Sequence, residues 1–337
     1  MVAPGQPSPY VLPPGPYAGA VVVSPPVAVL VPAPPLPSYR WSAAVDALFL
    51  DRSAGGCVPL GYTLRNPAYS SHPRDSLYSD DWPFPLEPGM RLEISRKFDK
   101  DIALTATYWG LQQWSVGDTI YGDPDRQSLL AFSPYLQLPG LLKGLDDSLG
   151  YTCASKIENA EFNAHFRLNS YDPYRELDWL WGARYVYFAD HLTLTGVDDL
   201  NSASERLAYS TTNNLIGVQT GLFLVQGWER FQWEVGLKLG LMANLYHQHG
   251  TDAANDPSGI PGGFTPYDIS NNGCGLSALF EFSLGTRYRI NDNLWFRLGY
   301  QVYDITGLAL APRQLGGRGH GGNVALDGLS IGLQGTW

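Results

Sequence analysis

Side-chain polarity alternates with a period of two along most of the chain from Tyr39 to the final residue. In residues 230–246, RFQWEVGLKLGLMANLY, the odd positions from 231 to 241 are large and apolar, and the even positions between them are mostly polar or glycine. Successive side chains of a β-strand point to opposite faces, so this pattern predicts a strand with one apolar face. The last residues, DGLSIGLQGTW, repeat it, and no predicted helix is available to cover these faces.

The alternating segments predict ten strands, several of 12 residues or more, whereas strands of soluble proteins average about five or six. Strands that cross a membrane need about 9 to 11 residues. Short turns are predicted at Asp99, 169–174, 226–230 and 291–293, and long loops at 51–89, 113–155, 192–210, 247–274 and 306–323. Outer-membrane barrels join their strands in this manner, with short periplasmic turns and longer outer loops. We therefore predict an all-β fold, an antiparallel transmembrane β-barrel of about ten strands.

Composition narrows the classes of protein further. Charged residues make up only 16% of the chain and the net charge is −10, which argues against nucleic acid as a partner. The three cysteines lack the spacing of a zinc ribbon or a redox motif. No uninterrupted apolar run is long enough for a transmembrane helix, and no basic region marks an export signal, which we expect to have been removed.

Two regions follow from the distribution of proline. Residues 1–37 contain 12 of the 26 prolines and no charged residue. This composition predicts a proline-rich linker or disordered arm over residues 1–38, followed by a barrel over residues 39–337.

Closure of the barrel explains the terminal tryptophan. Lipid does not tolerate an open sheet edge, so the tenth strand is expected to pair with the first. Aromatic side chains are enriched where a barrel meets the membrane surface. The predicted girdle residues are Trp179, Trp181, Tyr187, Phe231, Trp233 and Trp337.

The opposite parity carries charges of both signs, interleaved with glycines such as Gly182 and Gly236. The predicted lumen-facing residues are Glu161, His165, Arg167, Arg184, Gln219, Glu234, Lys238, Glu281, Arg287, Arg297 and Gln301. A ten-stranded barrel is narrow, so these side chains can fill the interior and pair ionically. A selective channel lined by the same charges is the alternative.

Six segments, taken in their order and spacing, are typical of a known family: WSAAVDALFLDR, LDWLWGARYVYF, TTNNLIGVQTGL, WEVGLKLGLMANLY, FRLGYQVYDITGLALAPRQL and the terminal strand. On these segments the sequence resembles the planctomycete outer-membrane β-barrel proteins, from about Tyr39 to Trp337. The resemblance implies an outer-membrane barrel. It implies no catalytic or ligand-binding residues, because the family has no established biochemical activity.

Three minor hypotheses concern the outer rim. His247 and His249 share a face and, with a third ligand, could bind zinc or copper. Asp190–His191 and Asp304 are the nearest candidates for a rim hydrolase, either an omptin-like protease or a lipid-modifying enzyme. The loops rich in aspartate and asparagine could bind calcium. Ordinary solvated side chains explain each of these features better, so we predict no metal and no cofactor.

We therefore expect a structural or surface-exposed barrel of a bacterial outer membrane, with a narrow pore for small polar solutes as an extension of that role. The expected partners are membrane lipid and the outer-membrane assembly machinery, and no enzyme activity is predicted. A rim hydrolase is the alternative function.

Overall fold

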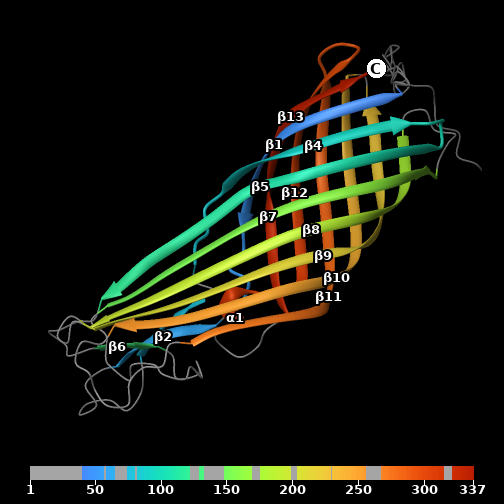
Figure 1. Cartoon of the computed structure of the whole chain (residues 1–337). Coiled ribbons are helices and arrows are strands. Elements are labelled where there is room, and N and C mark those ends of the chain that lie inside the picture. Colours follow the sequence, from blue (N-terminus) through green and yellow to red (C-terminus); the bar gives the residue numbers. More distant parts are fainter. Residues whose placement is uncertain are drawn as a thin grey trace, which may run out of the picture. The chain divides into compact units, whose positions relative to one another are not determined.

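A computed structural model describes residues 40–56, 58–64, 74–79, 82–121, 129–132, 148–168, 175–198, 203–228, 230–255, 267–314 and 321–337. The predicted arm, residues 1–38, lies outside this part. Within it, ten strands form one closed antiparallel barrel, as predicted (Figure 1). The barrel strands are β1 (Trp41–Arg52), β4 (Glu87–Lys97), β5 (Ile102–Tyr121), β7 (Ser148–Arg167), β8 (Arg175–Asp198), β9 (Ala203–Trp228), β10 (Phe231–Asn255), β11 (Tyr267–Arg289), β12 (Leu294–Leu308) and β13 (Gly322–Thr336).

The first and last strands close the barrel. β1 pairs with β13 from Ser42–Thr336 to Arg52–Leu326, and on its other side it pairs with β4. At the seam, Trp41 and Trp337 exchange two main-chain hydrogen bonds of 2.9 and 3.0 Å. The predicted pairing of the tenth strand with the first is therefore confirmed, and no edge is left open along this seam.

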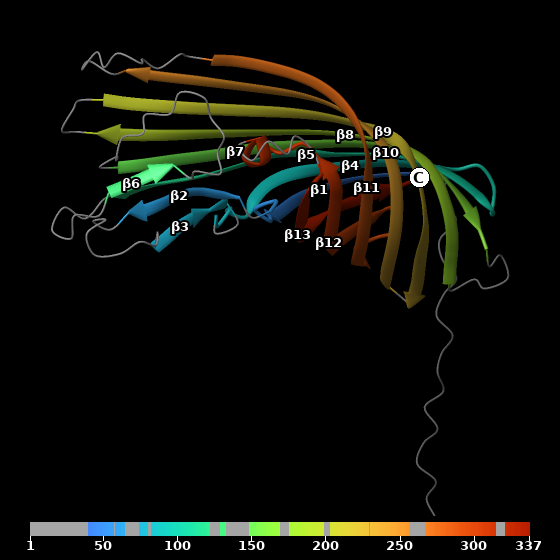
Figure 2. The same cartoon turned by 90° about the horizontal axis from the view of Figure 1, so that it is seen from below.

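The strands differ greatly in length. β5 and β7 to β11 have 20 to 26 residues, whereas β1, β4, β12 and β13 have 11 to 15. The long strands form one wall that extends beyond the rest of the barrel at the end with the longer connections, here called the loop end (Figures 1 and 2). The opposite end, which holds the C-terminus, is called the turn end.

The long wall corrects the predicted loop boundaries. Much of the predicted loops 113–155, 192–210 and 247–274 is strand, because the period-two pattern continues there with small polar residues in place of large apolar ones. The predicted loop 51–89 contains β2 (Pro59–Leu64) and β3 (Arg74–Tyr78). The predicted loop 306–323 contains a one-turn helix, α1 (Ala311–Gln314), where no helix was expected.

The turn end has the tight connections that the sequence predicts. In the turn from β4 to β5, Asp99 Oδ1 accepts hydrogen bonds of 2.8 Å from the main-chain amides of Asp101 and Ile102. In the turn from β11 to β12, Asn291 Oδ1 accepts a 2.9 Å hydrogen bond from the amide of Asn293. Aspartate and asparagine favour tight turns because their side chains bond to nearby main-chain amides. The predicted turn 169–174 lies outside the described residues.

The outward face of the barrel is apolar at the turn end and becomes polar toward the loop end. On β10, the outward side chains are apolar from Phe231 to Leu245, and they are polar at His247 and His249. β11 shows the same change between Leu276 and Asn272. Among the described residues, no helix is long and apolar enough to cross a membrane.

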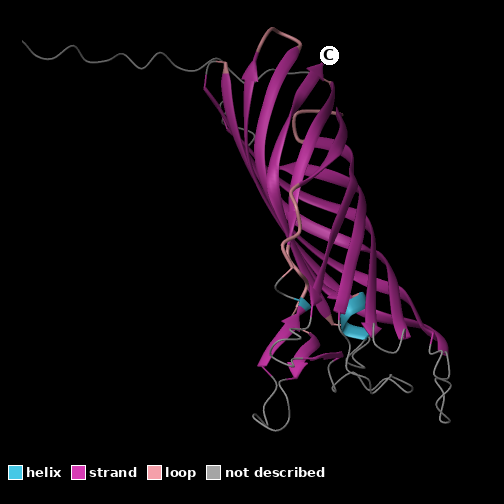
Figure 3. Ribbon diagram, turned by 90° about the vertical axis from the view of Figure 1, so that its left-hand side faces the viewer, coloured by secondary structure: helices cyan, strands magenta, loops and turns pink. Residues whose placement is uncertain are grey.

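The interior is apolar toward the loop end. Leu149, Leu192, Leu194 and Leu207 point inward from the long wall and are fully or almost fully buried. They belong to a cluster with Val58, Leu60, Trp82, Phe84, Leu308, Leu310 and Ala311, which come from the chain between β1 and β4 and from the α1 region. We call the described parts of these two inserted regions, residues 53–56, 58–60, 82–86 and 309–314, the plug. A second sheet of β2, β3 and β6 (Leu129–Phe132) lies at this end (Figure 3).

Candidate functional site

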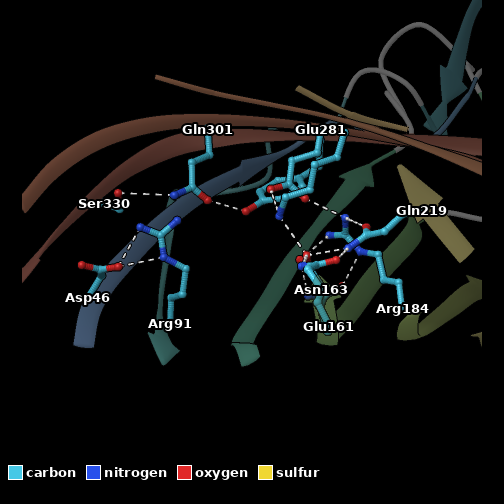
Figure 4. A network of polar contacts seen from close by, with 12 residues as sticks. Asp46, Arg91, Glu161, Asn163, Arg184, Gln219, Glu281, Gln301 and Ser330 are labelled. Atoms are coloured by element: carbon cyan, nitrogen blue, oxygen red, sulfur yellow. Dashed lines mark hydrogen bonds and ion pairs between the residues drawn. The ribbon is translucent and has the colours of Figure 1, made fainter. Parts of the chain in front are cut away.

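An ion-paired network crosses the lumen between the plug and the turn end. Its centre is Arg184 on β8, whose side chain is fully buried. Arg184 lies 2.6 Å from Glu281 on β11 and 3.3 Å from Glu161 on β7 (Figure 4). Lys238 on β10 contacts the same two carboxylates, at 2.8 Å from Glu161 and 2.9 Å from Glu281. Two cations and two anions therefore neutralise one another inside the barrel.

Neutral polar side chains complete this central network. Asn159 accepts a 2.6 Å hydrogen bond from Arg184 Nε, and Asn163 donates a 3.1 Å hydrogen bond to Glu161. Gln219 on β9 donates to Glu161 at 2.9 Å and accepts from Arg184 at 3.2 Å. Buried charges are tolerated when they are both paired and hydrogen-bonded, and this cluster meets both conditions.

A second ionic cluster lies beside the first, against the short strands β1, β4 and β12. Asp46 on β1 is 1% exposed and lies 2.7 Å from Arg91 on β4. Arg297 on β12 approaches Asp46 at 3.6 Å, Glu93 at 3.4 Å and Glu234 at 3.7 Å. These contacts join strands from opposite walls of the barrel.

A third cluster lies closer to the turn end and is less buried. Arg167 contacts Glu176 at 2.9 Å and Asp178 at 2.8 Å, and Lys97 contacts Glu176 at 3.2 Å. His165 lies 3.9 Å from Asp178. These side chains are 14 to 23% exposed, against 0 to 1% for Arg184 and Glu161. The interior therefore becomes more accessible toward the turn end.

A polar cavity of about 140 Å³ occupies this part of the lumen. Its wall includes Lys97, Glu176 and Asp178 near the turn end and Glu161 and Trp109 further in. Trp109 is 1% exposed and packs on Tyr303 with 4.6 Å between ring centroids. Both aromatic residues also belong to the apolar cluster, so the charged part of the lumen adjoins the plug here.

A buried ion pair ties the plug to the barrel wall. Arg52 at the end of β1 lies 3.3 Å from Asp190 on β8, and both side chains are almost completely buried. The guanidinium of Arg52 stacks over Phe84 of the plug at 4.2 Å. The other oxygen of Asp190 accepts a 3.0 Å hydrogen bond from the main-chain amide of Ala311 in α1. Asp190 therefore holds both inserted regions.

Glycines provide the space for these side chains. A Cβ atom at Gly182 would lie 2.0 Å from Asn163 Oδ1, and one at Gly332 would lie 2.2 Å from Asp46 Oδ1. A side chain at either position would displace a member of the polar clusters. The interleaved glycines are therefore part of the packing, as the sequence suggested.

The structure places all of the predicted lumen residues on the inward face. They are Glu161, His165, Arg167, Arg184, Gln219, Glu234, Lys238, Glu281, Arg287, Arg297 and Gln301, and all of them line the cavity or contact a residue of the three clusters. The aromatic residues predicted for the girdle point outward. Trp179, Trp181, Phe231, Trp233 and Trp337 are 37 to 61% exposed near the turn end, and Tyr187 is half-buried further along β8, with Lys156 above its ring.

The candidates for rim chemistry are not brought together. Asp190 points inward, whereas His191 and Asp304 point outward from β8 and β12, which are not neighbouring strands. His247 and His249 lie within β10 rather than beyond it, and they contact Asn272 at 2.8 Å and Asp268 at 3.4 Å. The described residues contain no group of three or more His, Cys, Asp or Glu side chains able to hold a metal ion. Most of the proposed calcium loops lie outside these residues.

Sequence reasoning missed Arg52 and the inward role of Asp190. Both share the inward parity of their strands, and Arg52 continues the series Asp46, Leu48 and Leu50. Extending the alternation of β1 by two residues beyond Leu50 would have predicted that Arg52 faces the lumen. The plug gives no such signal, because its contacts depend on the chain folding back into the lumen.

Comparison with solved structures supports the fold class. The outer membrane protease OmpT of Escherichia coli is similar over 90% of this chain and 99% of its own, with a TM-score of 0.52 and 12% sequence identity. A FadL homologue of Pseudomonas aeruginosa aligns over 89% of this chain and 90% of its own, with a TM-score of 0.24 and 9% identity. No protein-family model and no curated protein matches the sequence.

The chain is thus a closed antiparallel barrel with the fold of outer-membrane proteins. The similarity to OmpT extends to the fold alone at this level of identity. The resemblance to the planctomycete family stays a prediction.

Proposed function

We propose that this protein is an occluded barrel of a bacterial outer membrane, with a structural role at the cell surface. Two observations support the membrane location: the fold resembles an outer-membrane protein, and the barrel has an apolar outward belt. On β10 this belt runs from Trp233 to Leu245. At about 3.3 Å per residue and a tilt of about 40°, it spans about 30 Å, the thickness of a hydrocarbon core.

In this orientation the outward aromatic residues form the two girdles. Trp179, Trp233 and Trp337 lie near the turn end, which we place at the periplasm, and Tyr187 lies at the outer boundary of the belt. Indole and phenol rings favour the membrane surface because one end is apolar and the other is polar. The long wall then projects beyond the membrane on the outer side.

The filled lumen is the main observation that supports an occluded barrel. The central network of Glu161, Arg184, Lys238 and Glu281 crosses the interior, and the plug fills the loop end with apolar side chains. A solute would have to break buried ion pairs and displace the plug to pass. Wide aqueous lumens are found in barrels of about 16 strands, not ten.

Membrane location can be tested by fractionation of a bacterial host that exports the protein. The barrel should appear in the outer-membrane fraction and should migrate faster on gels before heating than after it. Recovery in the soluble fraction at high concentration without detergent would contradict the proposal.

A narrow pore is the second candidate function, because the polar cavity at the turn end is partly accessible. Liposome swelling distinguishes the two. Proteoliposomes in an isotonic solution of a small sugar should not swell if the barrel is occluded, whereas a pore would admit the sugar. We place rim hydrolysis behind both candidates, since Asp190, His191 and Asp304 do not share a site.

A further inference from the structure

Among the residues that the structure describes, part of β11 has no partner strand on one side, and we call this side the free edge. From Tyr267 to Ser277, β11 pairs with β10 on one side, and its pairing with β12 begins only at Ala278. At Gly307, which has a φ of 79°, the register of β12 shifts and the chain leaves the wall toward α1. Within the described part of the chain, no strand covers the other side of residues 267–277.

The hydrogen-bonding pattern shows which residues face this edge. The amide of Arg289 bonds to Arg230, the residue before β10, and the amide of Ile290 bonds to Leu294 on β12. In an antiparallel ladder the amide and carbonyl of a residue point to the same side, and the side alternates along the strand. Since the register with β10 is unbroken, odd residues of β11 bond to β10 and even residues face the β12 side.

Four residues therefore present main-chain groups to the free edge. They are Asp268, Ser270, Asn272 and Cys274, and all four are exposed. Leu276 also has an even number, but Gly307 of β12 covers its carbonyl oxygen. A Cβ atom on Gly307 would lie only 2.3 Å from this oxygen. The free edge thus offers four amides and four carbonyls spaced as in an ordinary ladder, with no strand opposite them among the described residues.

The usual protections of an edge strand are missing here. Residues 267–277, YDISNNGCGLS, contain no lysine, arginine or proline, and their pairing with β10 has no bulge. Proteins commonly use such features to prevent pairing with other chains. The side chain of Ile269, on the other face of the strand, is 55% exposed, so both faces of β11 are accessible near this residue.

The opposite edge of the long wall, on β5, is protected where β4 ends. β5 has a bulge between Gly110 and Gln113, where Leu111 has a φ of 75°. Beyond it, Trp114 Nε1 donates a 3.1 Å hydrogen bond to the carbonyl of Leu50 on β1. This side chain reaches across the gap left by the end of β4 and is 1% exposed. β5 therefore has two protecting features, a bulge and a side chain that bonds to β1, which residues 267–277 of β11 lack.

We propose that this edge, residues 268–274 of β11, is a docking site for an uncharged, extended polypeptide segment of another protein. The segment would add to the wall as an antiparallel strand, held mainly by main-chain hydrogen bonds. The absence of charge, apart from Asp268, favours a neutral segment. In the proposed membrane orientation this site lies on the outer side, where soluble proteins can reach it.

A second copy in the same membrane does not fit this edge. Two barrels related by a two-fold axis along the membrane normal have their β11 strands running in the same direction. Their tilts are then opposed at the contact, so the strands cross instead of aligning. A segment that is free to rotate in solution meets no such restriction.

Hydrogen exchange of the free protein in detergent tests the edge itself. The amides of Asp268, Ser270, Asn272 and Cys274 should exchange at least tenfold faster than those of Ile269, Asn271 and Gly273, which bond to β10. Equal protection of the two sets would mean that the edge is already covered and would overturn the proposal.

Peptide binding tests the docking. The probe is a fluorescein-labelled peptide with the uncharged sequence of residues 244–251, NLYHQHGT, since this segment of β10 pairs with residues 268–275 of β11 on its other side. Fluorescence anisotropy should show saturable binding to the folded barrel in detergent micelles. Binding should slow exchange of the four edge amides. No binding at millimolar protein, or binding without this protection, would overturn the proposal.

Matched variants identify the binding groups. Ser270→Pro and Asn272→Pro each remove one edge amide without removing a bond to β10, and proline is tolerated at such positions. Each should weaken peptide binding at least tenfold, whereas Ser270→Ala and Asn272→Ala should change it less than twofold. N-methylation of alternate residues gives two peptides, one methylated on the amides that face the edge and one on the amides that face away from it. Only the first should fail to bind. Equal binding by the alanine and proline variants, with heat-modifiable folding intact, would exclude main-chain docking.

Discussion

Arg184 and Glu281 are joined by a 2.6 Å ion pair, although their strands, β8 and β11, are separated in the barrel wall by β9 and β10. A contact between strands that are not neighbours must cross the lumen. Lys238, on β10, lies between the two strands and also contacts Glu281. The network therefore connects opposite sides of the barrel wall through the interior.

Replacing Arg184 with alanine should destabilise the barrel strongly. The change leaves Glu161 with one cation instead of two in a fully buried site, and breaking a buried ion pair costs about 3–5 kcal/mol. Lys156 and Glu158 provide the control, since this pair is more than 40% exposed and Lys156→Ala should cost about 1 kcal/mol or less. Urea unfolding in detergent micelles measures both values. Equal losses for the two variants would show that the network does not hold the walls together.

The outward face can be tested at two adjacent residues of β10. Leu237 points outward and is 39% exposed, whereas Lys238 points inward to Glu161. Leu237→Arg should cost about 2–4 kcal/mol if the residue lies near the middle of a bilayer. Lys238→Arg keeps the charge in the lumen and should fold far better. The comparison is folding yield into lipid vesicles, and equal yields would reverse the assignment of the two faces.

The terminal strand should matter more than the proline-rich arm. Deleting Gly335 to Trp337 removes the two hydrogen bonds between Trp41 and Trp337 and the pairing of Thr336 with Ser42. Unpaired main-chain groups in hydrocarbon cost several kcal/mol each, so closure should fail. Deleting residues 1–37 leaves this seam intact.

The readout for these two truncations is the amount of heat-modifiable barrel in the membrane fraction. We expect a large loss for the three-residue deletion and little for the arm deletion. If both give the same yield, the last three residues are not needed for closure of the barrel.

The barrel itself could be predicted from the sequence because every strand contributes to one repeating pattern. The alternation of Leu237, Leu239 and Leu241 with Lys238 and Gly240 defines both faces of β10 without any tertiary information. The residues of the central network follow the same parity, and in the structure they contact one another inside the barrel. Pairing of the first and last strands followed from the cost of an open edge in lipid.

The ends of the strands and the plug could not be predicted in the same way. Beyond Leu245, β10 continues with His247 and His249 facing outward, so its apolar signal stops while the strand goes on. The contact of Arg52 with Asp190 joins residues 138 positions apart and depends on where the plug inserts. Nothing local in the sequence encodes that position.

Conductance in a planar bilayer is the most direct test of the central claim that the lumen is closed. The matching open variant has residues 53–84 replaced by a short Gly–Ser linker and also carries Arg184→Ala. The linker can be short because β1 and β4 already pair at Leu50 and Glu87. The purified wild-type barrel should insert without stable current steps, and the folded double variant should conduct. Stable open steps from the wild-type barrel would contradict the account.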